Sequence, residues 1–233
     1  MRIAIMQPYF LPYIGYFQLV NAVDKFVIYD NIQFVKKGWI NRNRILVNGK
    51  DEFITVPLKK DSDYLNIDQR QLADTFDEDK EKLLRRIKES YRKAPHFKTV
   101  YPILENLFNC NSKNLFSFIF ESIQSVCEYI DINTEFVISS NVDVDHSLKS
   151  EQKVLSIANK MNAQTYINAI GGLELYSPTN FIRLNIDLKF IQSDTLYYRQ
   201  FDNEFVPWLS IVDVMMFNSK QEIKKMLQAF TIK

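Results

Sequence analysis

Apolar and polar residues near the N-terminus alternate in a way that predicts a strand, a short helix and a second strand. Residues 3–6 are apolar and stop at Gln7-Pro8, where proline cannot continue a sheet ladder. Apolar residues at helical spacing begin at Gly15, and residues 25–29 form another apolar run. This order is the opening of a βαβ unit, which implies a parallel sheet.

The following segment predicts a β-hairpin and then a block of helices. Residues 43–49 and 52–58 are rich in β-favouring side chains and meet around Asn48-Gly49, a pair typical of two-residue hairpin turns. Apolar residues then recur at helical spacing from about residue 76 to 131, which predicts a helical insertion. The run from Thr75 to Glu78 has the form of a capping box at its start.

Strands and helices alternate again in the second half of the chain. They are predicted at residues 136–138, 149–161, 165–167, 188–191, 209–217 and 219–229. The whole pattern predicts a single α/β domain over residues 1–233, with the helical insertion at about 76–131. Its fold class is a Rossmann-like, mostly parallel sheet with helices on both faces, plus the β-hairpin.

The composition argues against a nucleic-acid-binding protein and against a membrane-spanning one. The chain has 29 Lys and Arg against 28 Asp and Glu, a balance that argues against nucleic-acid binding through a broad basic field. Cys110 and Cys127 lie in an apolar helical region, which favours two free thiols. No signal peptide and no stretch of ~18 apolar residues is found. We therefore expect a cytoplasmic protein with no membrane span, no assigned metal or cofactor, and an open oligomeric state.

Candidate chemistry lies in the loops after the predicted strands, because ligands of open parallel sheets bind beyond the carboxyl ends of the strands. In the first loop, Gly15 at a helix start lets backbone amides approach an anion. Tyr13 and Tyr16 bracket it as the histidines do in HIGH-type adenylyltransferases, although tyrosine supplies no cationic imidazole. These tyrosines either face a ligand or pack the loop onto the sheet.

The second loop, residues 30–43, concentrates polar groups. Asp30 at a strand end can hold a metal, a ribose hydroxyl or an amine, and Trp39 can stack on a ring. Arg42, flanked by two asparagines, suits phosphate or carboxylate recognition. The alternative is a surface loop in which Trp39 anchors the core and Arg42 is solvated.

The remaining candidates carry weaker signals. Gly171-Gly172 follows a predicted strand and either cradles a phosphate or forms a tight turn. Ser210 and Asp213 match a capping box with aspartate in place of glutamate. His146 follows two aspartates, an ordinary composition for a loop at the start of a helix.

Six runs along the chain form a recognisable set. They are QPYFLPYIGYFQLV, VIYDNIQFVKKGWINRNRI, TVPL, YRKAPHF, AQTYINAIGG and PWLSIVDVMMFN. Together they resemble the WbqC-like protein family over essentially the whole chain. The chain departs from that family at Tyr13, where tryptophan is common, and at residues 168–172, where a Ser-Gly form is expected.

The resemblance implies a setting and a set of site residues. Such proteins occur in bacteria, often near genes for O-antigen and other surface polysaccharides, which implies a cytoplasmic role in making or decorating an activated sugar. The candidate catalytic residues are Asp30, Gln7 and Tyr16. The candidate substrate-binding residues are Tyr13, Gly15, Gln33, Trp39, Asn41, Arg42, Asn43, Gly171, Ser210 and Asp213.

Three hypotheses about function remain open at this point. The first is a transferase that adds an acyl or aminoacyl group to a nucleotide-activated amino sugar: Arg42 and the Gly15 amides hold phosphate, and Asp30 orients or deprotonates the amine. The second is adenylyl transfer from ATP by a degenerate HIGH-like site. The third is a non-catalytic binding subunit of a polysaccharide-synthesis complex. In the first the ligand is a small molecule, a nucleotide-sugar.

Overall fold

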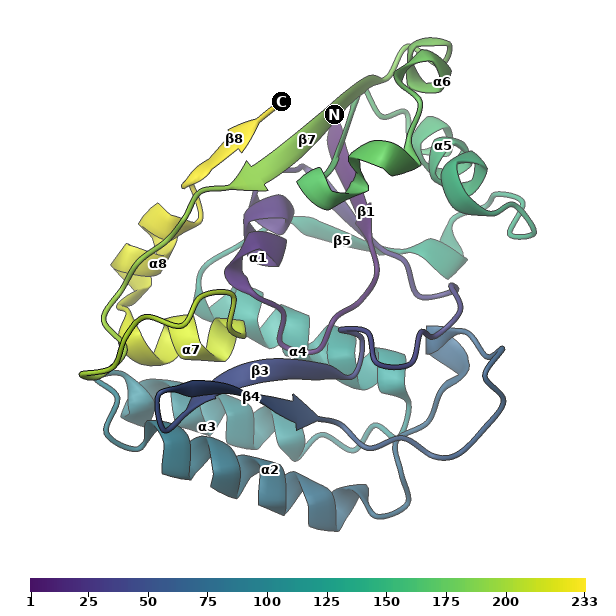
Figure 1. Cartoon of the computed structure of the whole chain (residues 1–233). Helices are drawn as coiled ribbons and strands as arrows, with labels where there is room; N and C mark the ends of the chain where they lie inside the picture. Colours follow the sequence, from purple (N-terminus) through teal and green to yellow (C-terminus); the bar gives the residue numbers. More distant parts are fainter.

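The computed structural model describes residues 1–233 and is built around a six-stranded sheet (Figure 1). The strands lie in the order β5-β2-β1-β6-β7-β8, and every neighbouring pair is parallel except β7 and β8. The strands are β1 Arg2–Met6, β2 Lys25–Ile28, β5 Glu135–Ile138, β6 Thr165–Ala169, β7 Asp187–Ser193 and β8 Phe230–Ile232. The chain therefore begins in the middle of its own sheet.

The strand order contains one switch point, between β1 and β6. From β1 the chain adds β2 and β5 on one side, and from β6 it adds β7 and β8 on the other. This is the order of doubly wound Rossmann sheets, in which a crevice forms where the connections diverge. The predicted Rossmann-like, mostly parallel sheet is confirmed. Strand β8 was not predicted, because three residues are too few to show a periodic pattern.

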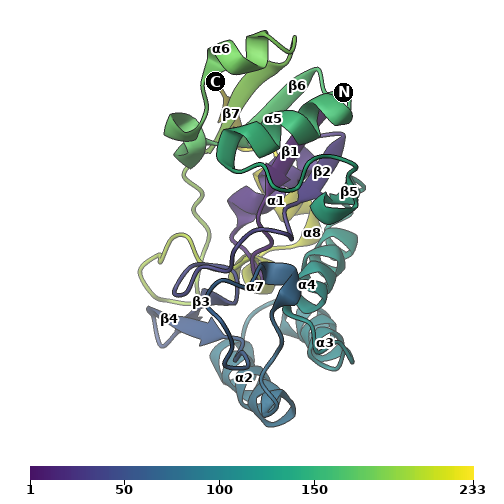
Figure 2. The same cartoon turned by 90° about the vertical axis from the view of Figure 1, so that its right-hand side faces the viewer.

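Helices cover both faces of the sheet (Figures 1 and 2). One face packs against α1 (Ile14–Asn21), α4 (Leu115–Tyr129), α7 (Ile211–Phe217) and α8 (Lys220–Met226). The other face packs against α5 (Ser150–Lys160) and α6 (Pro178–Ile182). Alternate side chains of a strand point to opposite faces, so Ala4 enters the first apolar cluster and its neighbours Ile3 and Ile5 enter the second. No helix has the length and apolarity that a membrane crossing requires.

The predicted hairpin forms a separate two-stranded sheet beside the helices of the insertion. Strands β3 (Arg42–Val47) and β4 (Lys50–Thr55) are antiparallel. Asn48 and Gly49 have φ of +50° and +78°, and two positive values are what the tightest hairpin turn requires. Helices α2 (Phe76–Tyr91) and α3 (Phe97–Phe108) lie beyond the hairpin in Figure 1. The hairpin and the helical block are thus confirmed.

The predicted capping box at the start of α2 is wrong, although the helix begins where it was expected. Thr75 has φ −86° and ψ 4°, and its side chain accepts no bond from the helix backbone. An N-cap residue that closes a capping box is extended, and Thr75 is not. Its hydroxyl instead donates to the Asp79 carboxylate at 2.8 Å.

Candidate functional site

A cavity of about 460 Å³ opens at the carboxyl ends of β1 and β6. Gln7 follows β1, Asn168 and Ala169 end β6, and both groups line the cavity. The first turns of α1 and α5 contribute Gly15 and Ser150. The cavity thus occupies the switch point of the sheet, and its volume falls in the ~300–1,000 Å³ range of small-molecule sites.

Aromatic rings dominate the walls of this switch-point cavity. Five tyrosines line it: Tyr9, Tyr13, Tyr16, Tyr29 and Tyr176. The one charged lining residue is Glu151, in the first turn of α5. Its carboxylate accepts from the Ser177 amide and, at 2.8 Å, from the Asn180 side chain, so it also fixes the start of α6. A cavity of this charge favours a neutral or cationic group over an anion.

Two side-chain amides at the ends of the adjacent strands retain hydrogen-bonding capacity. The Gln7 side chain makes no hydrogen bond within the protein, and Asn168 uses only its Oδ1, which accepts from the Ala169 amide at 2.8 Å. A Cβ on Gly172 would lie 2.4 Å from Asn168 Nδ2, whereas a Cβ on Gly171 would meet nothing within 4 Å. Gly172 therefore leaves room for the Asn168 amide, and Gly171 borders open space in the cavity.

A second, smaller depression of about 180 Å³, here called the tryptophan cleft, adjoins the cavity. It is lined by Tyr9, Pro12, Tyr13, Trp39, Asn43, Arg44 and Trp208. Tyr9 and Tyr13 line both spaces, so the two are neighbours that share these side chains. Trp39 is 43% exposed and Trp208 53%. Trp208 also has φ of +60°, a conformation that costs a bulky residue of order 1–3 kcal/mol.

The loop between β1 and α1 is held in place by residues that the sequence made candidates for ligand binding. Asn43 Nδ2 donates to the Leu11 carbonyl at 2.9 Å, and the Ser210 hydroxyl donates to the same oxygen at 2.7 Å. Leu11 itself has φ of +43°. Ser210 also caps α7 by accepting from the Val212 amide. The Leu11 carbonyl thus joins the first loop to β3 and to α7.

Asp213 is not the partner of Ser210 in a capping box but the centre of a buried polar cluster. The hydroxyls of Tyr91 and Tyr198 donate to its two oxygens at 2.8 and 2.7 Å, and Gln200 Nε2 donates at 2.7 Å. Burial raises the pKa of Asp213, and the three donors oppose that rise. Asp213 lines neither space, and its contacts join α2 to α7.

Asp30 is likewise buried and engaged. The backbone amide and the hydroxyl of Ser140 donate to its two carboxylate oxygens at 2.9 and 2.6 Å, and Asp30 lines neither space. Nearby, burial lowers the pKa of Lys153, whose Nζ lies 2.5 Å from His146 Nδ1. No group of three or more His, Cys, Asp or Glu side chains is arranged to hold a metal ion.

Arg42 and Asn41 fix the loop that precedes β3. Arg42 donates through Nε to the Gly38 carbonyl at 3.0 Å and through Nη2 to the Lys37 carbonyl. Its guanidinium lies 4.4 Å from the centre of the Phe53 ring. Asn41 Nδ2 donates to the Val56 carbonyl at 2.8 Å. Neither residue lines the cavity or the tryptophan cleft.

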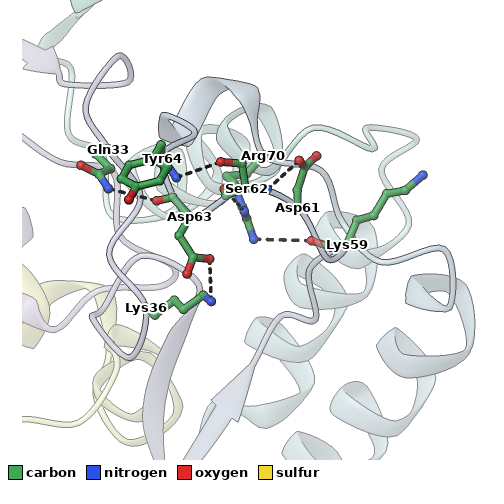
Figure 3. A network of polar contacts seen from close by, with 8 residues as sticks. All are labelled: Gln33, Lys36, Lys59, Asp61, Ser62, Asp63, Tyr64 and Arg70. Carbon is green, nitrogen blue, oxygen red and sulfur yellow. Dashed lines mark hydrogen bonds and ion pairs between the residues drawn. The ribbon is translucent and has the colours of Figure 1, made fainter.

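Gln33 belongs to the network of polar contacts that Figure 3 shows around residues 59–66. Its Nε2 donates to the Asp63 carbonyl at 3.0 Å, and Lys36 forms an ion pair with the Asp63 carboxylate at 2.6 Å. Arg70 donates to the carbonyls of Ser62 and Lys59 from the other side. This network anchors one surface segment and lies outside the residues that line the cavity.

The tyrosines around Gly15 serve packing and the cavity together. Tyr16 is buried, packs 5.3 Å from the Phe26 ring and donates to the Gln7 carbonyl at 3.2 Å; burial raises its pKa well above the usual value. A Cβ on Gly15 would lie 2.3 Å from the Tyr13 ring and 2.7 Å from the Ser193 hydroxyl. Glycine is therefore required there for close packing of Tyr13.

Comparison with known proteins places the chain in a family. The sequence profile of the WbqC-like protein family matches residues 7–225. The chain belongs to the WbqC-like protein family. It is 26% identical over 219 residues to the uncharacterized protein Rv1507c of Mycobacterium tuberculosis, with 93% of each chain covered. No solved structure matches it.

In this member of the WbqC-like family, several residues that line the two spaces were not predicted as candidates, among them Tyr9, Asn168, Glu151, Arg44 and Trp208. In the sequence, Glu151 is an ordinary polar residue in the first turn of a predicted helix. Arg44 is one of the polar residues in a strand where polar and apolar positions alternate. Trp208 follows Pro207 just before a predicted helix, and a large aromatic at such a boundary was the one available signal. The structure brings Tyr13, Trp39 and Asn43 together at the tryptophan cleft as neighbours of these residues.

Proposed function

We propose that this protein transfers an acyl or aminoacyl group to the amine of a nucleotide-activated amino sugar, in the cytoplasm, during synthesis of bacterial surface polysaccharide such as O-antigen. The observation that carries the proposal is the switch-point cavity, whose only charged lining residue is a carboxylate, Glu151. A carboxylate among apolar walls attracts an ammonium group and can accept its proton. The resemblance to WbqC-like proteins supports the biosynthetic setting.

The chemistry follows from the groups at the cavity. The amine nitrogen attacks the carbonyl carbon of an activated acyl ester or thioester, so that a C–N bond forms and the bond to the leaving oxygen or sulfur breaks. Glu151 takes one proton from the ammonium group and so frees the nitrogen lone pair. The second proton, lost as the C–N bond forms, goes to the departing oxygen or sulfur, which leaves with the electron pair of the broken bond. The free amides of Gln7 and Asn168 donate hydrogen bonds to the carbonyl oxygen as negative charge develops on it.

The proposal gives several predicted residues a positioning role. Asp30 takes no part in proton transfer, because it is buried and lines neither space; its oxygens accept from Ser140. Tyr16 fixes Gln7 through the Gln7 carbonyl. Arg42 shapes the loop that carries Trp39 rather than holding phosphate, because it lines neither space and its Nε and Nη2 bind backbone carbonyls.

Thermal unfolding with matched ligands tests the proposal. UDP-glucosamine and UDP-glucose differ only by an amine in place of a hydroxyl, and dTDP- and GDP-sugars extend the set. At a hundred times Kd a ligand adds ~2.7 kcal/mol, which raises Tm by roughly 5–10 °C. We expect a larger shift with the free amine, and loss of that preference in Glu151→Gln.

Two outcomes would overturn the proposal in favour of the alternatives. A shift with ATP and magnesium, and with no nucleotide-sugar, would point to adenylyl transfer. The absence of a shift with every one of these ligands would point to a non-catalytic subunit of a polysaccharide-synthesis complex. Mass spectrometry of the amino sugar after incubation with acyl thioesters then checks for turnover directly.

A further inference from the structure

The tryptophan cleft has a positively charged lining residue, and the switch-point cavity has none. Arg44 is the only cationic residue that lines either space. The chain has two tryptophans, and both stand on the walls of this cleft. We propose that the cleft binds the nucleoside diphosphate part of the activated sugar, with the base stacked on a tryptophan and the diphosphate beside Arg44. This assignment rests on the proposed function and names where its substrate is held.

Each indole contacts neighbouring side chains with part of its surface and leaves the rest exposed to a ligand. Trp39 packs 6.0 Å from Phe53, and the Arg44 guanidinium lies 5.5 Å from its ring centre. Trp208 meets the Tyr13 ring at 6.0 Å and 70°. The indoles make no ring contact with each other, and both are about half exposed. Rings held rigidly in this way stack on nucleobases of any sequence, because every base has a π-face.

Hydrogen bonds of the flanking backbone hold Trp208 at the cleft in a strained conformation. Its φ of +60° is left-handed, which no bulky side chain prefers. The flanking segment keeps it there: the Ser210 amide donates to the Arg44 carbonyl at 2.8 Å, and the Ile211 amide donates to the Pro12 carbonyl at 2.8 Å. Residues in strained backbone conformations cluster at functional sites, and the half-exposed ring of Trp208 is available to a ligand.

Charge distribution orients the substrate across the two spaces. Arg44 pairs with Asp51 at 2.9 Å and donates to the Trp208 carbonyl at 3.4 Å, while its Nε is buried with no acceptor. A diphosphate beside this guanidinium is attracted, whereas the same group beside Glu151 is repelled. The amine of the sugar has the opposite preference. Tyr9 and Tyr13 border both spaces, so the two are adjacent, and the assignment places the phosphates at the cleft and the amine in the cavity.

Intrinsic fluorescence tests the assignment, because all tryptophan emission comes from the cleft. Titration with UDP or GDP, corrected for nucleotide absorbance, should change the emission saturably. Glucosamine, which has neither base nor phosphate, should not. Trp208→Phe keeps a ring and should bind UDP close to normally, whereas Trp208→Ala should bind it at least fivefold more weakly. Tyr64→Ala removes an exposed aromatic outside the cleft and should leave UDP binding unchanged.

The outcomes separate this inference from the proposed function. UDP that raises Tm without altering the emission overturns the cleft assignment and leaves the transferase proposal standing. UDP that alters the emission, combined with no preference for the amino sugar, supports the cleft assignment and contradicts the transferase proposal. An emission that depends on protein concentration, with a dimer in sedimentation velocity that Trp208→Ala abolishes, assigns the cleft to a second copy of the chain and overturns the inference.

Discussion

Two parts of the molecule bury polar side chains among aromatic rings: the cluster around Asp213 and the cavity at the ends of β1 and β6. Around Asp213, two tyrosine hydroxyls and the Gln200 amide occupy both carboxylate oxygens. At the cavity, the Gln7 side chain and Asn168 Nδ2 have no partner in the protein. The Asp213 carboxylate is fully hydrogen-bonded within the protein, whereas the side-chain amides at the cavity can still bond to a ligand.

The difference shows what separates a structural polar centre from a candidate site. Buried polar groups are paired because an unpaired one costs about 1–3 kcal/mol. Groups that stay unpaired at a cavity wall are available to a ligand, and groups that are fully paired hold elements together. Asp213 and Glu151 are both carboxylic acids on helices, and both accept hydrogen bonds from the protein, but only Glu151 lines a cavity. Variants at the two regions should therefore fail in different measurements.

The largest change in stability is expected at Asp213, whose carboxylate is fully hydrogen-bonded. Asp213→Ala removes the acceptor of the Tyr91 and Tyr198 hydroxyls and one of the acceptors of Gln200 Nε2, so the free energy of unfolding should fall by about 3 kcal/mol or more in urea titrations. Asp202→Ala, at a surface pair with side chains 83% and 90% exposed, should change it by less than about 0.5 kcal/mol. Wild-type stability of Asp213→Ala, with lost ligand binding, would instead place Asp213 at the ligand.

The next effect is expected in binding and not in stability. Glu151→Gln keeps an acceptor for the Ser177 amide but removes the charge from the cavity. Affinity for the amino-sugar nucleotide should fall roughly 10- to 100-fold by calorimetry, since a hydrogen bond to a charged group contributes ~1.5–3 kcal/mol. Affinity for the hydroxyl analogue should stay within about twofold. An equal loss for both ligands would contradict a specific contact with the amine.

A smaller difference in stability is expected between two variants of Trp208, whose backbone is strained. Glycine adopts positive φ freely, whereas alanine does not, so Trp208→Gly should be more stable than Trp208→Ala by about 1 kcal/mol in thermal unfolding. Both variants lose the indole and should bind UDP equally weakly. Equal stability of the two variants would show that the backbone at residue 208 relaxes when the ring is removed.

The smallest effect compares two adjacent glycines. Gly172→Ala must displace the Asn168 amide, because the added methyl would lie 2.4 Å from it. Binding should weaken by roughly fivefold, which corresponds to the ~1 kcal/mol of one hydrogen bond. Gly171→Ala meets no atom of the protein within 4 Å and should keep stability, so a loss of binding in this variant would report only the methyl added at the cavity wall. Identical behaviour of the two variants would remove Asn168 from the site.

The sequence predicted the elements well where local physics decides them. The apolar run of β1 stands out from its immediate neighbours in the sequence, and the Asn48-Gly49 turn depends on its own two residues; both are found where they were expected. The spacing at Thr75 suggested a capping box, but the local backbone placed its hydroxyl against Asp79 instead. Local patterns therefore located helix boundaries better than they described the bonds made there.

The candidate site was harder to read, because its polar groups are defined by distant neighbours. Asp213 is 122 positions from Tyr91, and no pattern around it announces that contact. Ser210 meets the Leu11 carbonyl across 199 positions. The rule that ligands bind beyond strand ends did direct attention to Gln7, Tyr13 and Trp39, which line the two spaces. That these residues bind a ligand stays a prediction.

The bond between Ser210 and the Leu11 carbonyl has a consequence for synthesis in the cell. A chain leaves the ribosome at about 5–20 residues per second, N-terminal part first. The first strand and its loop emerge long before the segment with Trp208 and Ser210 that completes them. The nascent chain thus carries an incomplete candidate site for most of its translation. A chaperone that shields the β1–α1 loop during this interval would act before any substrate can bind.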